Sequence, residues 1–357
     1  MHLVRFTCEG FRSLRSVAFD PAPGINLIAG DNAQGKTSLL EAILFAATAR
    51  SHRALSETEL VRAGADFFQI RAEARRDPRA VSIDARWYQG VKRFRVNGVL
   101  QTRISDILGK LCVVLFSPED IALIKGTAAH RRKFLDMELS QISPRYLGAL
   151  QLYRQSLRQR NEALRAAVPD AALLDAWDSQ LIQHGAVLMQ ERQAFIDRLS
   201  HYAAESYRRV AGGETLAIAY EPDAASPDDF AKILAKGRPG DIRRRATMRG
   251  PHRDDLDFRV EDRSARAFAS QGQQKTAALA VRMAELELVK ERTGEYPVLM
   301  LDEVFSELDE HRSRQLIESL APGVQCLLTA TDPHRRHSLL HCEHAAFRIV
   351  QGNLEKK

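Results

Sequence analysis

The sequence predicts an α/β fold in which a core of buried strands carries an antiparallel β subdomain and an inserted α-helical lobe. Apolar runs at residues 25–28, 111–116 and 298–301 are typical of buried strands in a parallel sheet. Residues 66–104 alternate between apolar and polar, as antiparallel strands do. Residues 140–210 instead carry apolar residues at helical spacing, which predicts long packed helices.

The N-terminal part of the chain predicts a strand pair followed by a phosphate-binding loop. Residues 3–8 alternate like a strand, and residues 17–19 are its expected partner. The loop matches the pattern G-x-x-x-x-G-K-[ST] between a strand and a helix that ends near Ala49. The residues predicted to hold the nucleotide are Gly30, Asp31, Asn32, Ala33, Gln34, Gly35, Lys36, Thr37 and Ser38.

The residue types in this loop suit a nucleotide and its metal ion. Gly30 and Gly35 let the backbone wrap closely around an anion, and the start of the helix adds the positive end of its dipole. Lys36 is expected to reach the β- and γ-phosphates, and the Thr37 hydroxyl to hold Mg²⁺. We therefore predict binding of ATP with Mg²⁺ here.

Two basic segments after the loop each allow two interpretations. The turn at residues 50–53 is either a contact for adenine or ribose or a solvated loop. The hairpin signalled by Asn97-Gly98 has one basic face, with Lys92, Arg93 and Arg95, which is either functional or a charged edge that resists aggregation.

The middle of the chain predicts the inserted lobe. Leu150, Leu157 and Leu164 share one seven-residue spacing, and a second series follows Pro169, so two antiparallel helices are expected. Residues 222–240 are rich in Pro, Asp, Ala and Gly and are expected to form a loop or a short helix. We predict a core of residues 1–120 and 245–357, with the lobe at 121–244.

The second half of the nucleotide site follows the apolar run at 298–301. Asp302 is expected to hold the Mg²⁺ shell, and Glu303 to orient or activate the attacking water, so Glu303, Lys36 and Asp302 are the candidate catalytic residues. Near residue 270 a second anion site is expected, because Ser270 and Gly272 lie just before a helix expected over 276–292 and can present a hydroxyl and free N–H groups. Since Lys36 and its loop already surround the phosphates, we expect Ser270, Gln271, Gly272 and Gln273 to meet the nucleotide of another subunit.

Net charge, cysteine pattern and hydropathy indicate the kind of partner and the cellular compartment. The net charge of +6 suits a polyanionic partner without proving one. The four cysteines form no C-x-x-C pair and three lie in apolar surroundings, as expected of free thiols in a reducing cytoplasm. No apolar run reaches the ~20 residues of a membrane span, and no signal peptide is recognisable, so a cytoplasmic protein without membrane contact is expected.

These motifs, in this order, resemble those of ABC-type ATPases. Residues 30–37 look like a Walker A loop and 299–303 like a Walker B strand. Residues 270–274 resemble the LSGGQ signature, and residues 306–309, which end in Asp309, resemble the D-loop. The resemblance implies an ABC-type P-loop head that dimerises on ATP, with two nucleotides held between Walker A of one head and the signature of the other.

Within that group the chain is similar to the RecF family of bacterial recombination mediators. The strings GFRSL, LFSPEDIALIKG, RRKFLD, RGPHRDDL and ASQGQQKT carry this resemblance, and they are scattered over nearly the full length. The resemblance implies a head like that of SMC proteins with a compact lobe in place of coiled-coil arms. It also implies slow ATP hydrolysis, binding to gapped DNA, help in loading RecA through RecR, and a role in repair and replication restart.

The chain departs from the ABC pattern at three places. The signature lacks the paired glycines, Ser117-Pro118-Glu119 stands where many members carry the Q-loop glutamine, and no switch histidine follows residues 326–329. A slow ATPase that acts as a timer for a clamp is the expected consequence.

An ATP-gated DNA clamp is therefore the leading hypothesis, with contacts mostly to phosphate. A transporter ATPase and a P-loop kinase for small molecules are the alternatives, and the helical lobe and the signature respectively argue against them. The residues expected to contribute to DNA binding are Arg131, Arg132, Arg243, Arg244 and Arg245.

Overall fold

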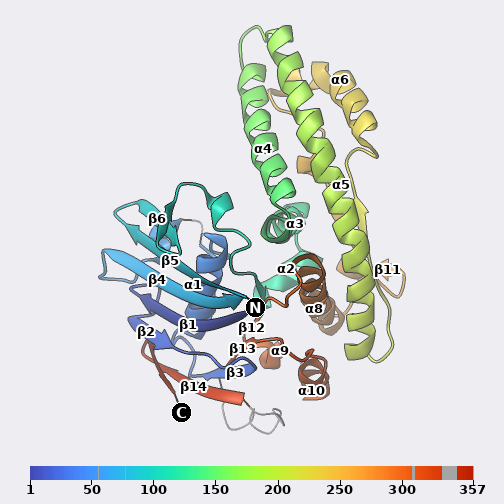
Figure 1. The fold of residues 1–357 in the computed structure, drawn as a ribbon. Helices are drawn as coiled ribbons and strands as arrows, with labels where there is room; N and C mark the ends of the chain where they lie inside the picture. The colour runs from blue at the N-terminus through green and yellow to red at the C-terminus, as the bar shows by residue number, and fades with distance from the viewer. Residues whose placement is uncertain (55, 77, 308–309, 332–343, 357) are drawn as a thin grey trace.

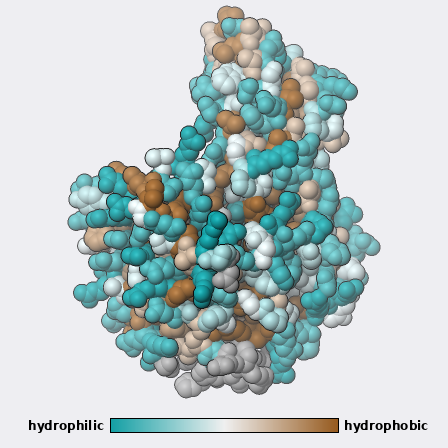
Figure 2. Space-filling view, in the orientation of Figure 1, coloured by the Kyte–Doolittle hydropathy of each residue, from teal (hydrophilic) through white to brown (hydrophobic). Residues whose placement is uncertain are grey.

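The computed structural model describes residues 1–54, 56–76, 78–307, 310–331 and 344–356, and it has a head from which a helical lobe rises (Figure 1). Most of the face seen in Figure 2 is hydrophilic, and its outline is indented between the head and the lobe. No helix among the described residues is long and apolar enough to cross a membrane.

The central sheet of the head is mainly parallel, as the apolar runs predict. Its strand order is β15-β14-β3-β13-β12-β8. The strands are β3 (Ile25–Ala29), β8 (Val113–Phe116), β12 (Val298–Leu301), β13 (Cys326–Ala330), β14 (His344–Val350) and β15 (Asn353–Lys356), of which only β15 runs antiparallel to its neighbour. The carboxyl ends of β3, β13 and β12 therefore meet at one edge of the sheet, where such folds place their ligands.

A second, antiparallel sheet forms the predicted β subdomain, in the order β2-β1-β4-β5-β6-β7. The strands are β1 (His2–Glu9), β2 (Ser16–Phe19), β4 (Phe67–Arg76), β5 (Arg79–Tyr88), β6 (Val91–Val96) and β7 (Val99–Gln101). Helix α1 (Lys36–Thr48) contacts strands of both sheets and is buried on nearly every side. A helix that is buried on every side needs apolar residues around its whole circumference. Most residues of α1 are apolar, and they are not confined to one face.

The lobe is built on a pair of antiparallel helices, α4 (Pro144–Leu164) and α5 (Ala171–Val210). Each begins at a capped residue: Ser143 accepts a hydrogen bond from the Tyr146 N–H, and Asp170 accepts from the first turn of α5. Helices α3 (Ala128–Ile142) and α6 (Pro227–Arg244) pack against this pair, and the short α2 (Ile121–Lys125) packs against α3.

A small sheet and helix α8 connect the lobe to the head. Strand β9 (Leu216–Glu221) pairs with β10 (Asp255–Val260), which pairs with β11 (Arg263–Ser264). The helices that follow are α7 (Ala265–Phe268), α8 (Gln271–Thr293), α9 (Val304–Glu307) and α10 (Glu310–Glu318), and α8 packs along α5. Because β9 from the predicted lobe pairs with β10 from the predicted core, the boundary at residues 244/245 divides one sheet; the division into domains stays a prediction.

Two sequence expectations about helices need correction. Residues 227–244 form the full helix α6 rather than a loop or short helix, with Pro239 inside it. Its N-cap Ser226, Pro227 at the first position and the complete burial of Phe230 and Leu234 outweigh the unfavourable composition. Helix α8 begins at Gln271, five residues earlier than expected, because Ser270 caps it.

The three described cysteines, Cys8, Cys112 and Cys326, are buried and free, as predicted. Burial raises the pKa of the Cys112 thiol to about 11, so this thiol stays protonated and unreactive at neutral pH. Cys342 lies outside the described residues.

Candidate nucleotide-binding site

The predicted phosphate loop lies between the end of β3 and the start of α1. The Gly30 N–H donates to the Ala330 carbonyl of the neighbouring strand, which fixes where the loop leaves the sheet. Gly35 is the N-cap of α1, with φ of 115°, and no side chain caps the helix there. The first backbone N–H groups of α1 are therefore free to bind an anion.

Close packing explains why glycine occupies both positions 30 and 35 of the loop. A Cβ at Gly30 would lie 2.6 Å from the Ile349 carbonyl oxygen, and one at Gly35 would lie 2.9 Å from a Leu14 methyl carbon. Gly35 also has a φ that L-residues rarely adopt. Any side chain at Gly30 would push the loop off strand β14, so the loop shape depends on the distant C-terminal strand.

The C-terminal hairpin also holds Gln34, a contact that sequence analysis missed. The Gln351 N–H donates to Gln34 Oε1 at 2.6 Å, and the Gly352 N–H donates to the Gln34 carbonyl at 3.1 Å. Residues more than 300 positions apart thereby meet, and no local sequence signal announces such a contact.

Lys36 is buried and satisfied entirely by its surroundings. Its Nζ donates to the carbonyl oxygens of Gly30 at 2.7 Å and Asp31 at 3.0 Å, and forms an ion pair with Glu303 Oε1 at 3.0 Å. Glu303 also accepts hydrogen bonds from Thr331 at 3.1 Å and Ser306 at 3.2 Å. The two candidate catalytic residues are thus in direct contact in this structure.

Asp302 lies beside Thr37, as a shared metal site requires. It accepts a hydrogen bond from Thr329 Oγ1 at 2.7 Å and another from Thr37. Burial raises the pKa of Asp302 above its ordinary value, and these two hydrogen bonds oppose the rise only in part. A buried carboxylate next to a hydroxyl is an oxygen-only donor set that suits Mg²⁺, and a dication would offset the cost of burying that charge.

An open cavity of about 320 Å³ lies over the loop. Its lining residues are Ser13, Asn32, Ala33, Gly35, Lys36, Thr37, Ser38, Arg53 and Glu303. Of the predicted loop residues, Gly30, Asp31 and Gln34 lie outside this lining. Sequence analysis missed Ser13, whose hydroxyl lies 2.9 Å from that of Ser38.

Residues of the basic turn at 50–53 line two different cavities. Arg53 lines the cavity over the loop and pairs with Glu119 at 3.4 Å, so the residue at the Q-loop position reaches the site through an arginine. Arg50 instead lines a different cavity, between the head and the lobe. A contact of this turn with adenine or ribose stays a prediction for Arg53.

The signature residues begin helix α8 and do not line the cavity over the phosphate loop. Ser270 is the exposed N-cap of α8: its Oγ accepts from the Gln273 N–H at 3.2 Å, and Gln273 Oε1 accepts from the Ser270 N–H at 2.8 Å. None of Ser270, Gln271, Gly272 and Gln273 lines the cavity over the loop of the same chain. Asp309 of the predicted D-loop lies outside the described residues.

The five arginines expected at DNA differ greatly in exposure. Arg131 is 3% exposed and binds Asp255 through two nitrogens, at 2.5 and 2.9 Å, so it has no surface to offer DNA. Arg132 is half-buried and donates to the Asp254 carbonyl at 2.8 Å. Arg243, Arg244 and Arg245 are exposed at the end of α6, and within the described part of the chain they form no ion pair.

The sheet order, the Gly30–Ser38 loop and the Asp302-Glu303 pair define the class of protein: a P-loop head of the ABC type. The family model "RecF/RecN/SMC N terminal domain" matches residues 2–342. The DNA replication and repair protein RecF of Symbiobacterium thermophilum is 42% identical over 93% of this chain and 92% of its own length. RecF of Lactobacillus johnsonii is 40% identical over the whole of both chains.

Solved structures agree with the sequence relatives. The recombination mediator protein RecF with ATP, of the RecFOR pathway, is 32% identical and superimposes with a TM-score of 0.92 over 100% of this chain and 97% of that one. The Smc head domain of Pyrococcus furiosus, at 17% identity and a TM-score of 0.60, shares the fold alone. The chain therefore belongs to the RecF/RecN/SMC family and, within it, to the RecF proteins.

Proposed function

We propose that the protein is an ATP-dependent, DNA-binding recombination mediator that dimerises when it binds ATP. The observation that carries the proposal is the separation of two half-sites. The phosphate loop with Lys36 and Glu303 lines one cavity, whereas the exposed N-terminus of α8, with Ser270 and Gln273, faces elsewhere. One nucleotide touches both half-sites only when two chains face each other, so ATP favours the closed dimer by its differential affinity.

Within one half-site each residue has a defined role. The N–H groups of residues 31–38 and Lys36 bind the phosphates, and Lys36 must leave Glu303 to do so. Thr37 and Asp302 would hold Mg²⁺, which supplies charge neutralisation on the phosphate oxygens. Glu303, once freed from Lys36, accepts a proton from the attacking water, and Thr331 and Ser306 orient its carboxylate.

The proposal includes slow, DNA-stimulated hydrolysis of ATP to ADP and phosphate. The resting Lys36–Glu303 contact supports slowness, because the catalytic carboxylate is engaged until nucleotide displaces it. Solved RecF relatives with ATP support the choice of nucleotide. Hydrolysis then removes the shared ligand and lets the dimer open.

DNA is the proposed partner, in gapped form or at junctions of single and double strands. Arg243, Arg244 and Arg245 lie on an exposed helix end and pair with no carboxylate among the described residues, and Arg132 is a weaker candidate because it is half-buried. Arg131 is left out because Asp255 occupies it. A RecR-like mediator protein and assistance in loading RecA in the cytoplasm complete the proposed role.

Sedimentation tests the dimer directly. Wild type and Ser270→Arg are sedimented with and without ATP, and each with and without gapped duplex. We expect a dimer that needs ATP, becomes stronger with DNA and is lost in Ser270→Arg, because a long cation at the N-cap removes the cap and fills the anion site. Ser179→Arg, the same change at an exposed position of α5, is the matched control and should dimerise normally. Wild type that stays monomeric under every condition would rule the clamp out.

A further inference from the structure

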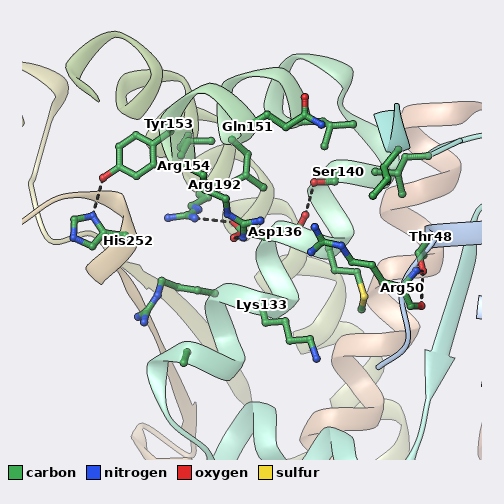
Figure 3. Close-up of a pocket in the computed structure, with 18 of the residues that line it drawn as sticks. Thr48, Arg50, Lys133, Asp136, Ser140, Gln151, Tyr153, Arg154, Arg192 and His252 are labelled. Atoms are coloured by element: carbon green, nitrogen blue, oxygen red, sulfur yellow. Dashed lines mark hydrogen bonds and ion pairs between the residues drawn. The ribbon is translucent and has the colours of Figure 1, made fainter. Parts of the chain in front are cut away.

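A second cavity, of about 380 Å³, lies between the head and the lobe, and the nucleotide mechanism does not use it. Figure 3 shows side chains from both parts around this cavity, among them Thr48 at the end of α1 and Arg50 after it, and Asp136, Gln151 and Arg154 on the lobe. Its size falls within the range of about 300–1,000 Å³ that ligand pockets commonly have.

Apolar side chains contribute most of the accessible lining of this cavity. Leu147, Leu150 and Leu157 of α4 contribute one wall, and Met137 of α3 lies beside them. Ile104 and Leu108, from the segment between β7 and β8, contribute the head side. Leu147 and Leu150 are buried, whereas Leu108, Met137 and Leu157 are half-buried and are available to contact an occupant.

The charged residues around the apolar lining are strongly unbalanced. Among the described lining residues, one side chain is a carboxylate, that of Asp136. Five are cationic: Arg50, Arg132, Lys133, Arg154 and Arg192. Asp136 is already saturated, since it accepts from Tyr146 at 2.5 Å, from Arg154 at 2.6 Å and from Arg192 at 2.8 Å.

Three of the cations have no carboxylate partner in the part of the chain that the structure describes. Lys133 donates to the His52 carbonyl at 3.3 Å and Arg132 to the Asp254 carbonyl, so both meet only neutral acceptors. Arg50 is exposed, and among the described residues no carboxylate pairs with it. Positive charge therefore surrounds an apolar hollow, which an occupant with the opposite charge and an apolar group would match.

We propose that this cavity, defined by its lining in α3, α4 and the segments after α1 and β7, binds an acidic peptide segment of a partner protein. A bulky apolar side chain of that segment fills the space between Leu108 and Leu157, and carboxylates beside it pair with Arg50 and Lys133. The proposal is independent of ATP-driven dimerisation and of DNA binding.

The lining favours a peptide over nucleic acid. Single strands bind to exposed aromatic faces on which bases stack. The described aromatic rings in the lining are Tyr153, which is 2% exposed, and His252, which is half-buried with Nδ1 2.8 Å from the Tyr153 hydroxyl and Nε2 3.0 Å from the Thr247 carbonyl, so neither is an open stacking platform. A duplex is far wider than the cavity, and leucines contribute nothing to phosphate binding.

Because the cavity lies against both the head and the lobe, its occupant would contact both. Thr48 closes helix α1, whose first turn forms the phosphate loop, and Thr48 lines this cavity. Any change that nucleotide causes in the position of the lobe relative to α1 would therefore alter peptide affinity, and the coupling would be reciprocal.

The test uses a fluorescein-labelled decapeptide with four acidic residues around a Leu-Phe pair, titrated with the full chain and followed by anisotropy. Two matched peptides replace the Leu-Phe pair by Ala-Ala or the acidic residues by Lys. We expect saturable binding of the first peptide alone. Equal binding of the Ala-Ala peptide, or binding of none of the three, would overturn the proposal.

Variants of the chain locate the binding. The double variant Arg50→Glu/Lys133→Glu and the single variant Leu108→Glu should each weaken peptide binding about tenfold or more, without changing ATP hydrolysis. Leu152→Glu is the control for Leu108→Glu, because Leu152 is 47% exposed on α4 and does not line the cavity. Arg158→Glu, also exposed on α4, is the control for charge. Both controls should bind peptide within twofold of wild type.

Nucleic acid is the competing occupant, and the same variants distinguish it. If Arg50→Glu/Lys133→Glu lowers affinity for gapped duplex while peptide binding is unchanged, the charges serve DNA and the peptide proposal fails. If peptide binding falls and DNA binding is unchanged, the proposal stands even if dimerisation by ATP were disproved.

Discussion

The nucleotide site and the contact between the lobe and α8 combine the same chemical groups with opposite results. At the nucleotide site Lys36 pairs with Glu303, which is 21% exposed and borders an open cavity. Between the lobe and α8, Arg282 pairs with Asp120, Glu138 and Glu285 at 2.7 to 2.9 Å, and all four side chains are at most 13% exposed. The first ion pair is open to an incoming ligand, whereas the second is closed.

The difference lies in what can replace each partner. A triphosphate entering the cavity can replace Glu303 on Lys36, so the pair is a resting arrangement. Nothing can enter to replace the partners of Arg282, which ties α8 to α3 and to the segment after β8. A buried cation with its carboxylates is strongly destabilising to break, although it adds little net stability. Both cations are buried, so access to the carboxylate from a cavity, rather than charge, separates the two ion pairs.

The largest expected effect is on the closed cluster. Arg282→Ala leaves Glu138 and Glu285 buried without a cation, so it should lower the free energy of unfolding by about 3–5 kcal/mol in urea titrations. Arg292→Ala, at an exposed position of the same helix, is the matched control and should stay within about 0.5 kcal/mol. A loss below about 1 kcal/mol for Arg282→Ala would mean that this cluster does not hold α8 to the lobe.

At the nucleotide site the same type of change should affect chemistry and leave the fold intact. Lys36→Ala should reduce the rate of ATP hydrolysis by about 10²–10³-fold, because the Lys36 ammonium no longer stabilises the negative charge that develops on the phosphate oxygens in the transition state. Its free energy of unfolding should stay within about 1 kcal/mol of wild type, since Glu303 keeps Thr331, Ser306 and partial solvent. Large destabilisation would instead place the Lys36–Glu303 pair with the structural clusters. Lys36→Arg then tells whether charge alone supports binding or hydrolysis.

The closed cluster should also respond to pH in a defined direction. Burial raises the pKa of Glu285, and that of Glu138, above the ordinary value of 4.5. The folded state therefore holds these protons more tightly than the unfolded state. Stability from this source is full below pH 4.5 and is lost as pH rises through the raised pKa.

The variant Glu285→Gln, which mimics the protonated glutamate and does not titrate, tests this pH dependence of stability. Wild type should gain unfolding free energy relative to Glu285→Gln as the pH is lowered through the raised pKa of Glu285 toward 4.5, in urea titrations at each pH. Parallel curves for the two proteins would show that Glu285 does not titrate in this range. Asp255, whose pKa is lowered by Arg131, contributes in the opposite direction but equally in both proteins.

Stability measurements also separate the arginines predicted at DNA, down to changes of about 0.5 kcal/mol or less. Arg131→Ala should cost about 1–3 kcal/mol, because Asp255 loses its partner. The triple variant Arg243→Ala/Arg244→Ala/Arg245→Ala should change stability by about 0.5 kcal/mol at most per site, since all three are exposed. If these three touch phosphate, the triple variant should lower the salt slope of DNA binding by up to about 3. An unchanged slope removes them from the DNA surface.

Local patterns predicted most of the elements. The hairpins of 66–104, the paired helices α4 and α5, and the loop between β3 and α1 follow from alternation, helical spacing and the G-x-x-x-x-G-K-[ST] pattern. Prediction was wrong where composition and burial disagreed, as at α6, where packing of Phe230 and Leu234 outweighed Pro239.

The sequence by itself determined the chemistry available: a phosphate loop, an Asp-Glu pair after a buried strand, and a capped helix start at Ser270. Each is a short-range pattern whose residues are fixed by backbone geometry within a few positions. Only the tertiary structure decided which charges are free. It buried Arg131 against Asp255, exposed Arg243–Arg245, set Gln34 against Gln351, and enclosed the cavity lined by Leu108 and Leu157. These outcomes depend on residues far apart in the chain, because solvent exposure is a property of packing and no local pattern encodes it.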